Sequence, residues 1–335
     1  MVRRLVWAAK ILAAIVVLAL AGVAAYVART WDRTYDAPLP ELRISSDPAV
    51  LARGEYLVYG PAHCVECHSG SFDALEKLSQ GVLVPLSGGL KLALGPLGAV
   101  YSRNLTPDPE TGIGRYSDAQ IARMMRWAVR PDGRSTVNPM MPFGDMGEDD
   151  LVAIVSYLRA QPPVRNAVPA NEWTLMGRVV KSFVSITKPR TSIHPPKTAP
   201  PQGVTKERGE YLARYVANCA GCHTPRDPNT FTATGPDFSG GFEMDPAALP
   251  GVDLTIWFRT PNITPEAGSA LMKFPDRETF IARFQRGGRK HAGSPMPWEA
   301  FARMTTEDIA AVYEYLHSLA PVDGPTGEPT FRKAD

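Results

Sequence analysis

The chain has 335 residues, enough for two domains of ordinary size, and 36 basic against 34 acidic residues leave a formal net charge of +2. This near-neutral balance lacks the basic footprint of a nucleic-acid-binding protein, so no nucleic-acid partner is expected. The 32 prolines and 28 glycines exceed what compact helical domains need and predict long, turn-rich loops between helices.

The amino-terminal segment has the pattern of a membrane-spanning helix. Arg3 and Arg4 precede an apolar stretch whose uncharged part, residues 11–27, is 17 residues long. This length exceeds the core of an ordinary signal peptide and reaches the lower limit for a transmembrane helix. The basic residues at its front predict a cytoplasmic amino terminus, with the rest of the chain across the membrane.

A cleaved signal peptide is the alternative interpretation of this segment. Ala19-Leu20-Ala21 offers a small-residue cleavage site of the A-x-A kind. We favour an uncleaved single-pass anchor over residues 1–30, followed by a linker over residues 31–50. The membrane is then a partner of the chain, and the inner (cytoplasmic) membrane is its expected location.

All four cysteines belong to two copies of the pattern C-x-x-C-H, the attachment site for c-type haem. Two thiols three positions apart can each add to one vinyl group of the same porphyrin. The histidine after the second thiol then lies under the iron as its proximal ligand. The sequence therefore predicts two haem c groups, attached at Cys64, Cys67, Cys219 and Cys222 and ligated by His68 and His223.

Other interpretations of the cysteines explain less. A zinc site can use two C-x-x-C pairs but does not require a histidine after each pair. Two disulfides would leave the identical spacing unexplained, and a thioredoxin-like motif occurs once per domain near a strand-helix-strand pattern, which we do not find. Covalent haem attachment takes place in the periplasm or an equivalent compartment, which agrees with an export segment.

The sequence around each haem motif is repeated. Arg53-Gly54-Glu55-Tyr56-Leu57 recurs as Arg208-Gly209-Glu210-Tyr211-Leu212, at the same offset of 155 that separates Cys64 from Cys219. Similar pairs are Ser87-Gly88-Gly89 with Ser239-Gly240-Gly241, and Asn104-Leu105-Thr106-Pro107 with Asn262-Ile263-Thr264-Pro265. We infer one duplicated domain. The expected domains are residues 51–165 and 205–325, joined by a proline-rich linker over 166–204 and followed by a tail over 326–335.

Each copy predicts a small set of helices. The first runs through the Arg-Gly-Glu-Tyr-Leu sequence into the haem motif, and Gly54 and Gly209 would let it cross the last helix closely. A second begins near Ser117, which forms a capping box with Gln120, and its counterpart starts near Asp276.

The last helix of each copy is the clearest. Apolar residues recur at helical spacing over residues 151–158 and 309–316, and Thr305 caps the second of these helices. The long loops between helices need an organiser, which a buried haem supplies. We therefore predict an all-α fold of two tandem cytochrome c-like domains behind one transmembrane helix.

The sixth iron ligand is predicted to be a methionine in both domains. Met141 and Met296 each stand in a Met-Pro-aromatic triplet shortly before the last helix, where proline stiffens the loop. A methionine thioether closes the iron site, whereas an open position would allow peroxide or oxygen chemistry. Met140 is the alternative ligand in the first domain.

Two further features have open interpretations. Asn104 and Asn262 precede a Thr-Pro turn, and their side chains either bind a haem propionate or close the turn. In the linker, one helical face would carry Trp173, Met176, Val180 and Phe183. Such a helix either docks on a partner, lies at the membrane surface, or packs across its own two domains.

These motifs together resemble the membrane-bound cytochrome c subunits of alcohol and gluconate dehydrogenases over residues 50–325. The resemblance is carried by His223-Thr224-Pro225-Arg226, by Asn104 to Asp108 with Thr111 to Gly114, and by the Met-Pro-aromatic loops. It implies a periplasmic protein that accepts electrons from a dehydrogenase and passes them towards quinone, a soluble cytochrome or an oxidase. It assigns haem-binding roles to Cys64, Cys67, His68 and Met141, and to Cys219, Cys222, His223 and Met296.

The chain departs from this family in three ways. The family typically carries three haems, this chain has an amino-terminal anchor, and its first haem motif is followed by Ser69 and Gly70 instead of Thr-Pro-Arg. A subunit of another respiratory or photosynthetic complex is therefore an alternative to a dehydrogenase partner.

The predicted function is single-electron transfer with no substrate chemistry of the chain's own. A di-haem peroxidase is the alternative, but it would need a vacant iron position, which the paired Met-Pro loops disfavour. A cytochrome with a cysteine axial ligand is disfavoured because no cysteine is left over.

Overall fold

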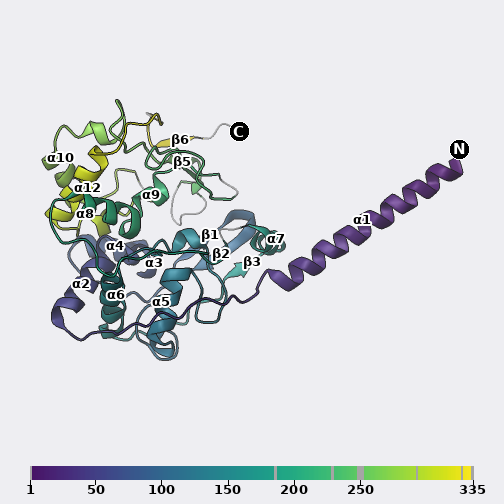
Figure 1. The fold of residues 1–335 in the computed structure, drawn as a ribbon, viewed down its shortest axis with the longest axis horizontal. Coiled ribbons are helices and arrows are strands. Elements are labelled where there is room, and N and C mark those ends of the chain that lie inside the picture. Colours follow the sequence, from purple (N-terminus) through teal and green to yellow (C-terminus); the bar gives the residue numbers. More distant parts are fainter. Residues whose placement is uncertain are drawn as a thin grey trace.

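A computed structural model describes residues 2–184, 187–227, 230–246, 253–291, 293–325 and 327–332. Within these ranges the protein is a mostly helical body from which one long helix projects (Figure 1). The helices are α1 (Val2–Thr30), α2 (Pro48–Tyr59), α3 (Cys64–His68), α4 (Phe72–Ser79), α5 (Asp118–Trp127), α6 (Glu148–Ala160), α7 (Leu175–Phe183), α8 (Lys206–Tyr211), α9 (Cys219–Cys222), α10 (Arg277–Arg286), α11 (Trp298–Phe301) and α12 (Thr306–His317).

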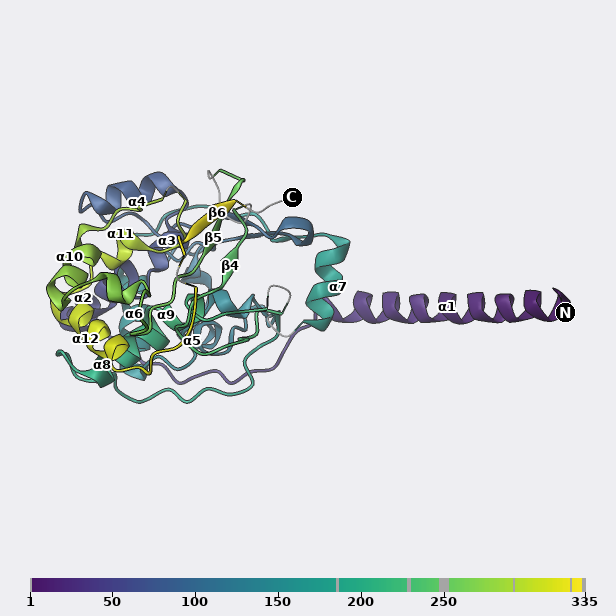
Figure 2. The same ribbon diagram turned by 90° about the horizontal axis from the view of Figure 1, so that it is seen from above.

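Helix α1 is 29 residues long and stands clear of the body (Figure 2). Val27 is its one buried residue. By length and composition it can cross a membrane, and it is the one such helix among the described residues. A signal sequence near the amino terminus passes the same test of length and composition.

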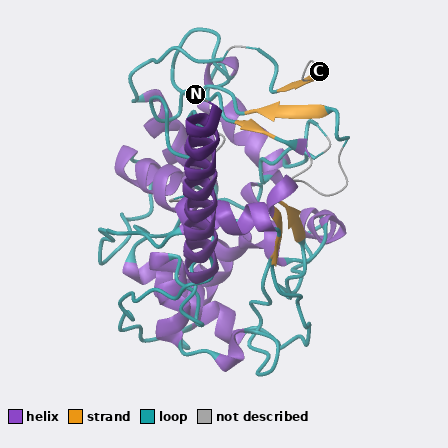
Figure 3. Ribbon diagram, turned by 90° about the vertical axis from the view of Figure 1, so that its right-hand side faces the viewer, coloured by secondary structure: helices purple, strands orange, loops and turns teal. Residues whose placement is uncertain are grey.

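The prediction of an all-α fold missed two small antiparallel sheets (Figure 3). Their strands are β1 (Lys91–Ala93), β2 (Gly98–Tyr101), β3 (Glu172–Trp173), β4 (Glu243–Met244), β5 (Ile256–Arg259) and β6 (Thr330–Arg332). The strand orders are β1-β2-β3 and β4-β5-β6. Strands β1 and β2 come from the long loop before α5, and β4 and β5 come from the long loop before α10. The third strand of each sheet follows the last helix of its unit, with β3 after α6 and β6 after α12. The loops expected to depend on haem alone therefore also have backbone hydrogen bonds of their own.

The third strands extend the two units beyond the predicted boundaries. Strand β3 lies in the expected linker, where its residues Glu172 and Trp173 pair with β2. Strand β6 lies in the expected tail and pairs with β5. The linker helix α7 begins at Leu175, so Trp173 is not on its apolar face.

The first and last helices of each unit cross at a glycine, as predicted. A Cβ atom on Gly54 would lie 2.1 Å from the carbonyl oxygen of Ala153, and one on Gly209 would lie 1.9 Å from that of Ala311. These distances are far below van der Waals contact, so glycine is required where α2 meets α6 and where α8 meets α12.

The predicted helix starts are confirmed. Ser117 and Gln120 form a reciprocal capping box at α5. Asp276 accepts a hydrogen bond from the backbone of Thr279 at α10, and Thr305 accepts one from the backbone of Asp308 at α12.

Two reciprocal contacts join the units. Arg208 and Asp308 form a bidentate buried ion pair, with distances of 2.8 and 3.0 Å. The Tyr56 hydroxyl, from the first unit, donates to the same carboxylate at 2.6 Å and accepts from the backbone N–H of Thr305 at 3.3 Å. A tyrosine of the first unit thus binds the start of the last helix of the second.

The mirror contact uses the equivalent residues. Arg53 and Asp150 form a bidentate pair at 2.8 and 2.9 Å. The Tyr211 hydroxyl donates to Asp150 at 2.7 Å and accepts from the backbone N–H of Gly147 at 3.0 Å. Each unit therefore supplies a tyrosine to the other.

Buried apolar side chains form one cluster through both units. It includes Leu57 and Ile154 from the first unit and Leu212 and Ile309 from the second. The ring of His63 also meets that of Phe301 edge-on at 5.6 Å. The two repeats share a core and form one body.

Replacing Gly209 with alanine should destabilise the protein by about 1–3 kcal/mol, because the new methyl group must push α8 away from α12. Thermal unfolding followed by circular dichroism should show a lower melting temperature. Gly22→Ala is the matched control, since a Cβ atom at Gly22 meets nothing within 4 Å. Equal melting temperatures for both variants would contradict the close crossing.

The Asp308 ion pair predicts a pH dependence. Burial alone would raise the pKa of Asp308, but the hydrogen bond and charge of Arg208 outweigh it and hold this pKa below its ordinary value. The carboxylate therefore contributes stability above the unfolded-state pKa of about 3.9, and this contribution is lost as pH falls through the lower folded pKa.

Asp308→Asn should accordingly cost about 3–5 kcal/mol near neutral pH, with a smaller difference from wild type as pH falls towards about 2. Denaturant unfolding at a series of pH values measures this. The exposed Asp36→Asn serves as control. A pH-independent difference between wild type and Asp308→Asn would count against an ionised, paired Asp308.

Candidate functional site

The predicted attachment residues lie on two short helices that follow the first helix of each unit. Cys64, Cys67 and His68 share α3, whereas Cys219 and Cys222 lie on α9, with His223 directly after it. The residue before each first cysteine, His63 or Asn218, is left-handed, with φ of 41° and 54°. This turn redirects the chain out of the preceding helix and begins the motif.

All four thiols are free of disulfide bonds. Burial raises the pKa of Cys64 and Cys219 to about 12 and that of Cys67 to about 11, because apolar surroundings disfavour the thiolate. Among the described residues no three His, Cys, Asp or Glu side chains gather in a way that could hold a metal ion. Neutral thiols in apolar surroundings fit the edge of a porphyrin.

Each motif histidine is held by a backbone carbonyl. His68 Nδ1 lies 2.6 Å from the carbonyl oxygen of Arg103, and His223 Nδ1 lies 2.8 Å from that of Pro261. Because the carbonyl can only accept, Nδ1 carries the proton and Nε2 keeps its lone pair. Burial also lowers the pKa of both histidines, although these hydrogen bonds oppose the shift. A neutral imidazole with a free Nε2 is the form that ligates iron.

The loop with the predicted ligand Met141 is fixed by two arginines. Met141 is half-buried against the core, whereas Met140 is 40% exposed. Arg126, itself buried, donates hydrogen bonds to the backbone carbonyls of Phe143, Gly144 and Met146. Arg190, from the linker, donates to the carbonyl of Met141. Its greater burial favours Met141 over Met140 as the predicted iron ligand.

The Met296 loop is fixed by different side chains. Met296 also packs against the core. Arg283 lies 3.5 Å from the ring centre of Trp298, a cation–π contact. Arg289 pairs with Glu299 at 2.9 Å and with Glu66 at 2.7 Å. Because Glu66 lies between Cys64 and Cys67, the attachment helix of the first unit is tied to the methionine loop of the second.

The two predicted asparagines close their turns. Asn104 Oδ1 accepts from the backbone N–H and the hydroxyl of Thr106, and its amide donates to the carbonyl of Val164. Asn262 makes the same three bonds with Thr264 and Val322. Their polar atoms are therefore engaged, which favours the turn-closing role over propionate binding.

Several positioning residues were missed from sequence. The carbonyls of Arg103 and Pro261 carry no sequence signature, since any residue supplies a carbonyl. Arg126 and Arg190 gave no signal either, because they contact backbone atoms far away in the chain. Arg53 and Arg208 were visible in the repeat, but their aspartate partners were not.

Comparison with known proteins finds relatives among cytochrome c subunits. No family model matches the chain. The cytochrome c subunit of a quinone alcohol dehydrogenase from Gluconacetobacter polyoxogenes is 31% identical over 309 residues, covering 85% of this chain and 59% of that protein. The gluconate 2-dehydrogenase cytochrome c subunit of Pantoea cypripedii is 28% identical over 291 residues, covering 83% and 61%.

The name of a third relative specifies two haems. A diheme cytochrome c-type protein of Cereibacter sphaeroides is 29% identical over 220 residues, covering 59% of this chain and 69% of that protein. The chain spans about three fifths of the length of the dehydrogenase subunits that it matches. The predicted resemblance is confirmed at about 30% identity over most of the chain, and an alignment over 85% of it includes both C-x-x-C-H motifs.

The ligand assignment predicts a spectral change on substitution. In haem-loaded protein, Met141→Ala and Met296→Ala should each convert one of two irons to high spin and lower its potential, because the thioether is removed. Absorption spectra and potentiometric titration measure both effects. Met140→Ala is the adjacent control and should leave both irons low spin. The assignment fails for the first unit if Met140→Ala and Met141→Ala exchange these outcomes.

Proposed function

We propose that this homologue of dehydrogenase cytochrome c subunits is a membrane-anchored di-haem cytochrome that carries single electrons in the periplasm. The observation that carries the proposal is the matched setting of the two motifs. In both, free thiols stand in helical register, and the following histidine has its Nδ1 on a backbone carbonyl. Iron in haem c supplies reversible one-electron chemistry when bound.

The chain's own contribution is to hold, orient and exclude water. Cys64 and Cys67, with Cys219 and Cys222, would fix the two porphyrins, and His68 and His223 would ligate the irons. The carbonyls of Arg103 and Pro261 hold the imidazole rings in one orientation and keep a proton on Nδ1. Arg126 and Arg190 restrict movement of the Met141 loop, which favours a closed iron site and carrier function over peroxidase chemistry.

The contact between the units supports electron exchange between two haems in one body. Glu66, inside the first motif, is paired with Arg289 beside the Met296 loop, and His63 meets Phe301 just after that loop. We propose that the two units are tandem cytochrome c domains from one duplication, which the matching contacts at Gly54 and Gly209 support.

The partner proposal follows from the names of the relatives. Alcohol and gluconate dehydrogenases contain the matched subunits, so a dehydrogenase is the proposed electron donor, with quinone, a soluble cytochrome or an oxidase as acceptor. Helix α1 is proposed to remain as an anchor in the inner membrane, with the body in the periplasm.

Holoprotein purified from membranes tests the function. A pyridine haemochrome assay should give two haem c per chain. The absorption spectrum of the oxidised protein should show both haems low spin, potentiometric titration should show single-electron reduction of each, and peroxidase activity should be negligible. Mass spectrometry should find residues 2–30 retained. A high-spin haem together with peroxide turnover would replace the carrier function by the peroxidase alternative.

A further inference from the structure

Helix α7 leaves an apolar face uncovered. Leu175, Met176, Val179 and Phe183 are 77, 54, 36 and 52% exposed, and their spacing places them on one side of the helix. The buried residues of the helix are the small Gly177 and Ser182. Four large apolar side chains on one face of a nine-residue helix are more than isolated surface residues and mark an interaction surface.

The helix is held firmly in this position. A Cβ atom on Gly177 would lie 2.1 Å from the carbonyl oxygen of Leu97, so α7 lies directly on the loop between β1 and β2. Thr174 caps the helix and donates its hydroxyl to the carbonyl of Pro96 at 2.7 Å. The exposed apolar face is therefore a fixed surface of the first unit.

The position of α7 identifies what covers this face. The helix lies crosswise at the base of α1 (Figure 2), and its Phe183 ring contacts the Tyr26 ring with centroids 5.1 Å apart. Tyr26 belongs to the apolar part of α1, about one turn before its end at Thr30. If α1 spans a bilayer, Tyr26 lies at the membrane boundary, and Phe183 must lie at the same depth.

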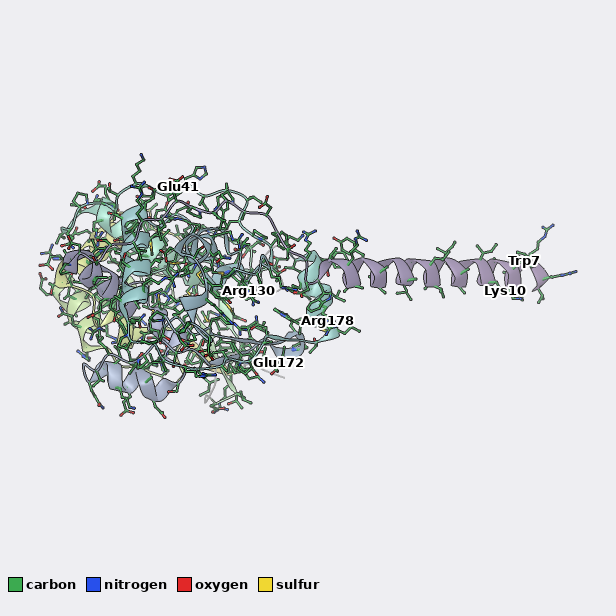
Figure 4. All side chains as sticks on the ribbon, turned by 90° about the horizontal axis from the view of Figure 1, so that it is seen from below. Trp7, Lys10, Glu41, Arg130, Glu172 and Arg178 are labelled. Carbon is green, nitrogen blue, oxygen red and sulfur yellow. The ribbon has the colours of Figure 1, made fainter. Side chains whose placement is uncertain are left out.

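Cationic side chains surround this level. Arg178 stacks on Trp31 at 4.6 Å, and Lys181 lies 5.4 Å from the ring centre of Trp173. Figure 4 shows Arg130 and Arg178 on the side of the body from which α1 projects. A cavity beside Trp31 is lined by four basic and two acidic side chains, which are Arg103, Arg130, Arg134 and Lys181 with Asp32 and Asp132. An exposed apolar face with cationic side chains beside it suits the boundary of a lipid bilayer, where the acyl chains meet the phosphate groups.

We propose that the Leu175–Met176–Val179–Phe183 face of α7 inserts into the outer surface of the lipid bilayer that α1 crosses, as a second membrane contact. This proposal rests on the anchor role proposed for α1. The two contacts together would fix the tilt of the body against the membrane. A single anchor helix lets the body swing on that helix, whereas a second helix that lies crosswise at its base and binds the bilayer prevents this movement.

Spin-label accessibility in full-length holoprotein tests this, with phosphatidylcholine/phosphatidylglycerol nanodiscs and no other protein present. Under the proposed function the native cysteines are thioethers, so one introduced cysteine carries the nitroxide, and labelled wild type measures background. Oxygen partitions into lipid and a nickel chelate into water, so their ratio reports depth. Met176→Cys and Val179→Cys should be accessible to oxygen and protected from nickel.

Three control positions make the outcome decisive. Leu18→Cys should report the bilayer interior, Val204→Cys bulk water, and Arg178→Cys a shallower depth than its neighbours on α7. Docking would be overturned if the labels at positions 176 and 179 were as accessible to nickel as the label at position 204 while the label at position 18 lay in the bilayer. The apolar face would then be assigned to a protein partner. A label at 18 in water would overturn the anchor and docking together, while haem content and reduction still test electron transfer separately.

Discussion

The structure depends on two arginine–aspartate pairs, one fully buried at Arg208–Asp308 and one with a half-buried arginine at Arg53–Asp150, and each pair takes a hydrogen bond from a tyrosine of the other unit. Removing a charge from water is costly, and an ion pair offsets this only when its remaining hydrogen-bonding positions are filled. Tyr56 adds a third hydrogen bond to the Asp308 carboxylate, and Tyr211 does so on Asp150. The ion pair that joins the first and last helices of each unit is thus supported by the other unit.

This dependence explains why a repeated sequence forms one body. The aspartates stand in the first turns of α6 and α12, so the tyrosine hydroxyls reach helix starts where backbone N–H groups also need acceptors. The continuous apolar core stabilises the contact between the units but does not set their orientation, because apolar burial is non-directional. The directional tyrosine hydrogen bonds set one orientation. For the two haems proposed above, a fixed orientation would matter because it would hold the path between them constant.

Features encoded by neighbouring residues were predictable, and features that need distant partners were not. The caps at Ser117, Asp276 and Thr305 involve residues three positions apart, and Gly54 and Gly209 were visible in the repeat. The haem motifs are similarly local. Strands of two to four residues have no periodicity to detect, and the Tyr56–Asp308 contact joins residues 252 positions apart. The methionine ligands remain a prediction from loop position.

The late third strand of each sheet has a consequence for assembly. Ala99 in β2 pairs with Glu172 in β3, and Phe258 in β5 pairs with Thr330 in β6, so each sheet is completed by a segment more than 70 residues downstream. Contacts of such sequence separation form slowly because a long loop must first close. If the segments nearest the proposed anchor cross the membrane first, each cysteine pair emerges before its sheet is complete. Under the proposed function, that interval would give a haem-attaching enzyme access to thiols that the finished fold partly covers.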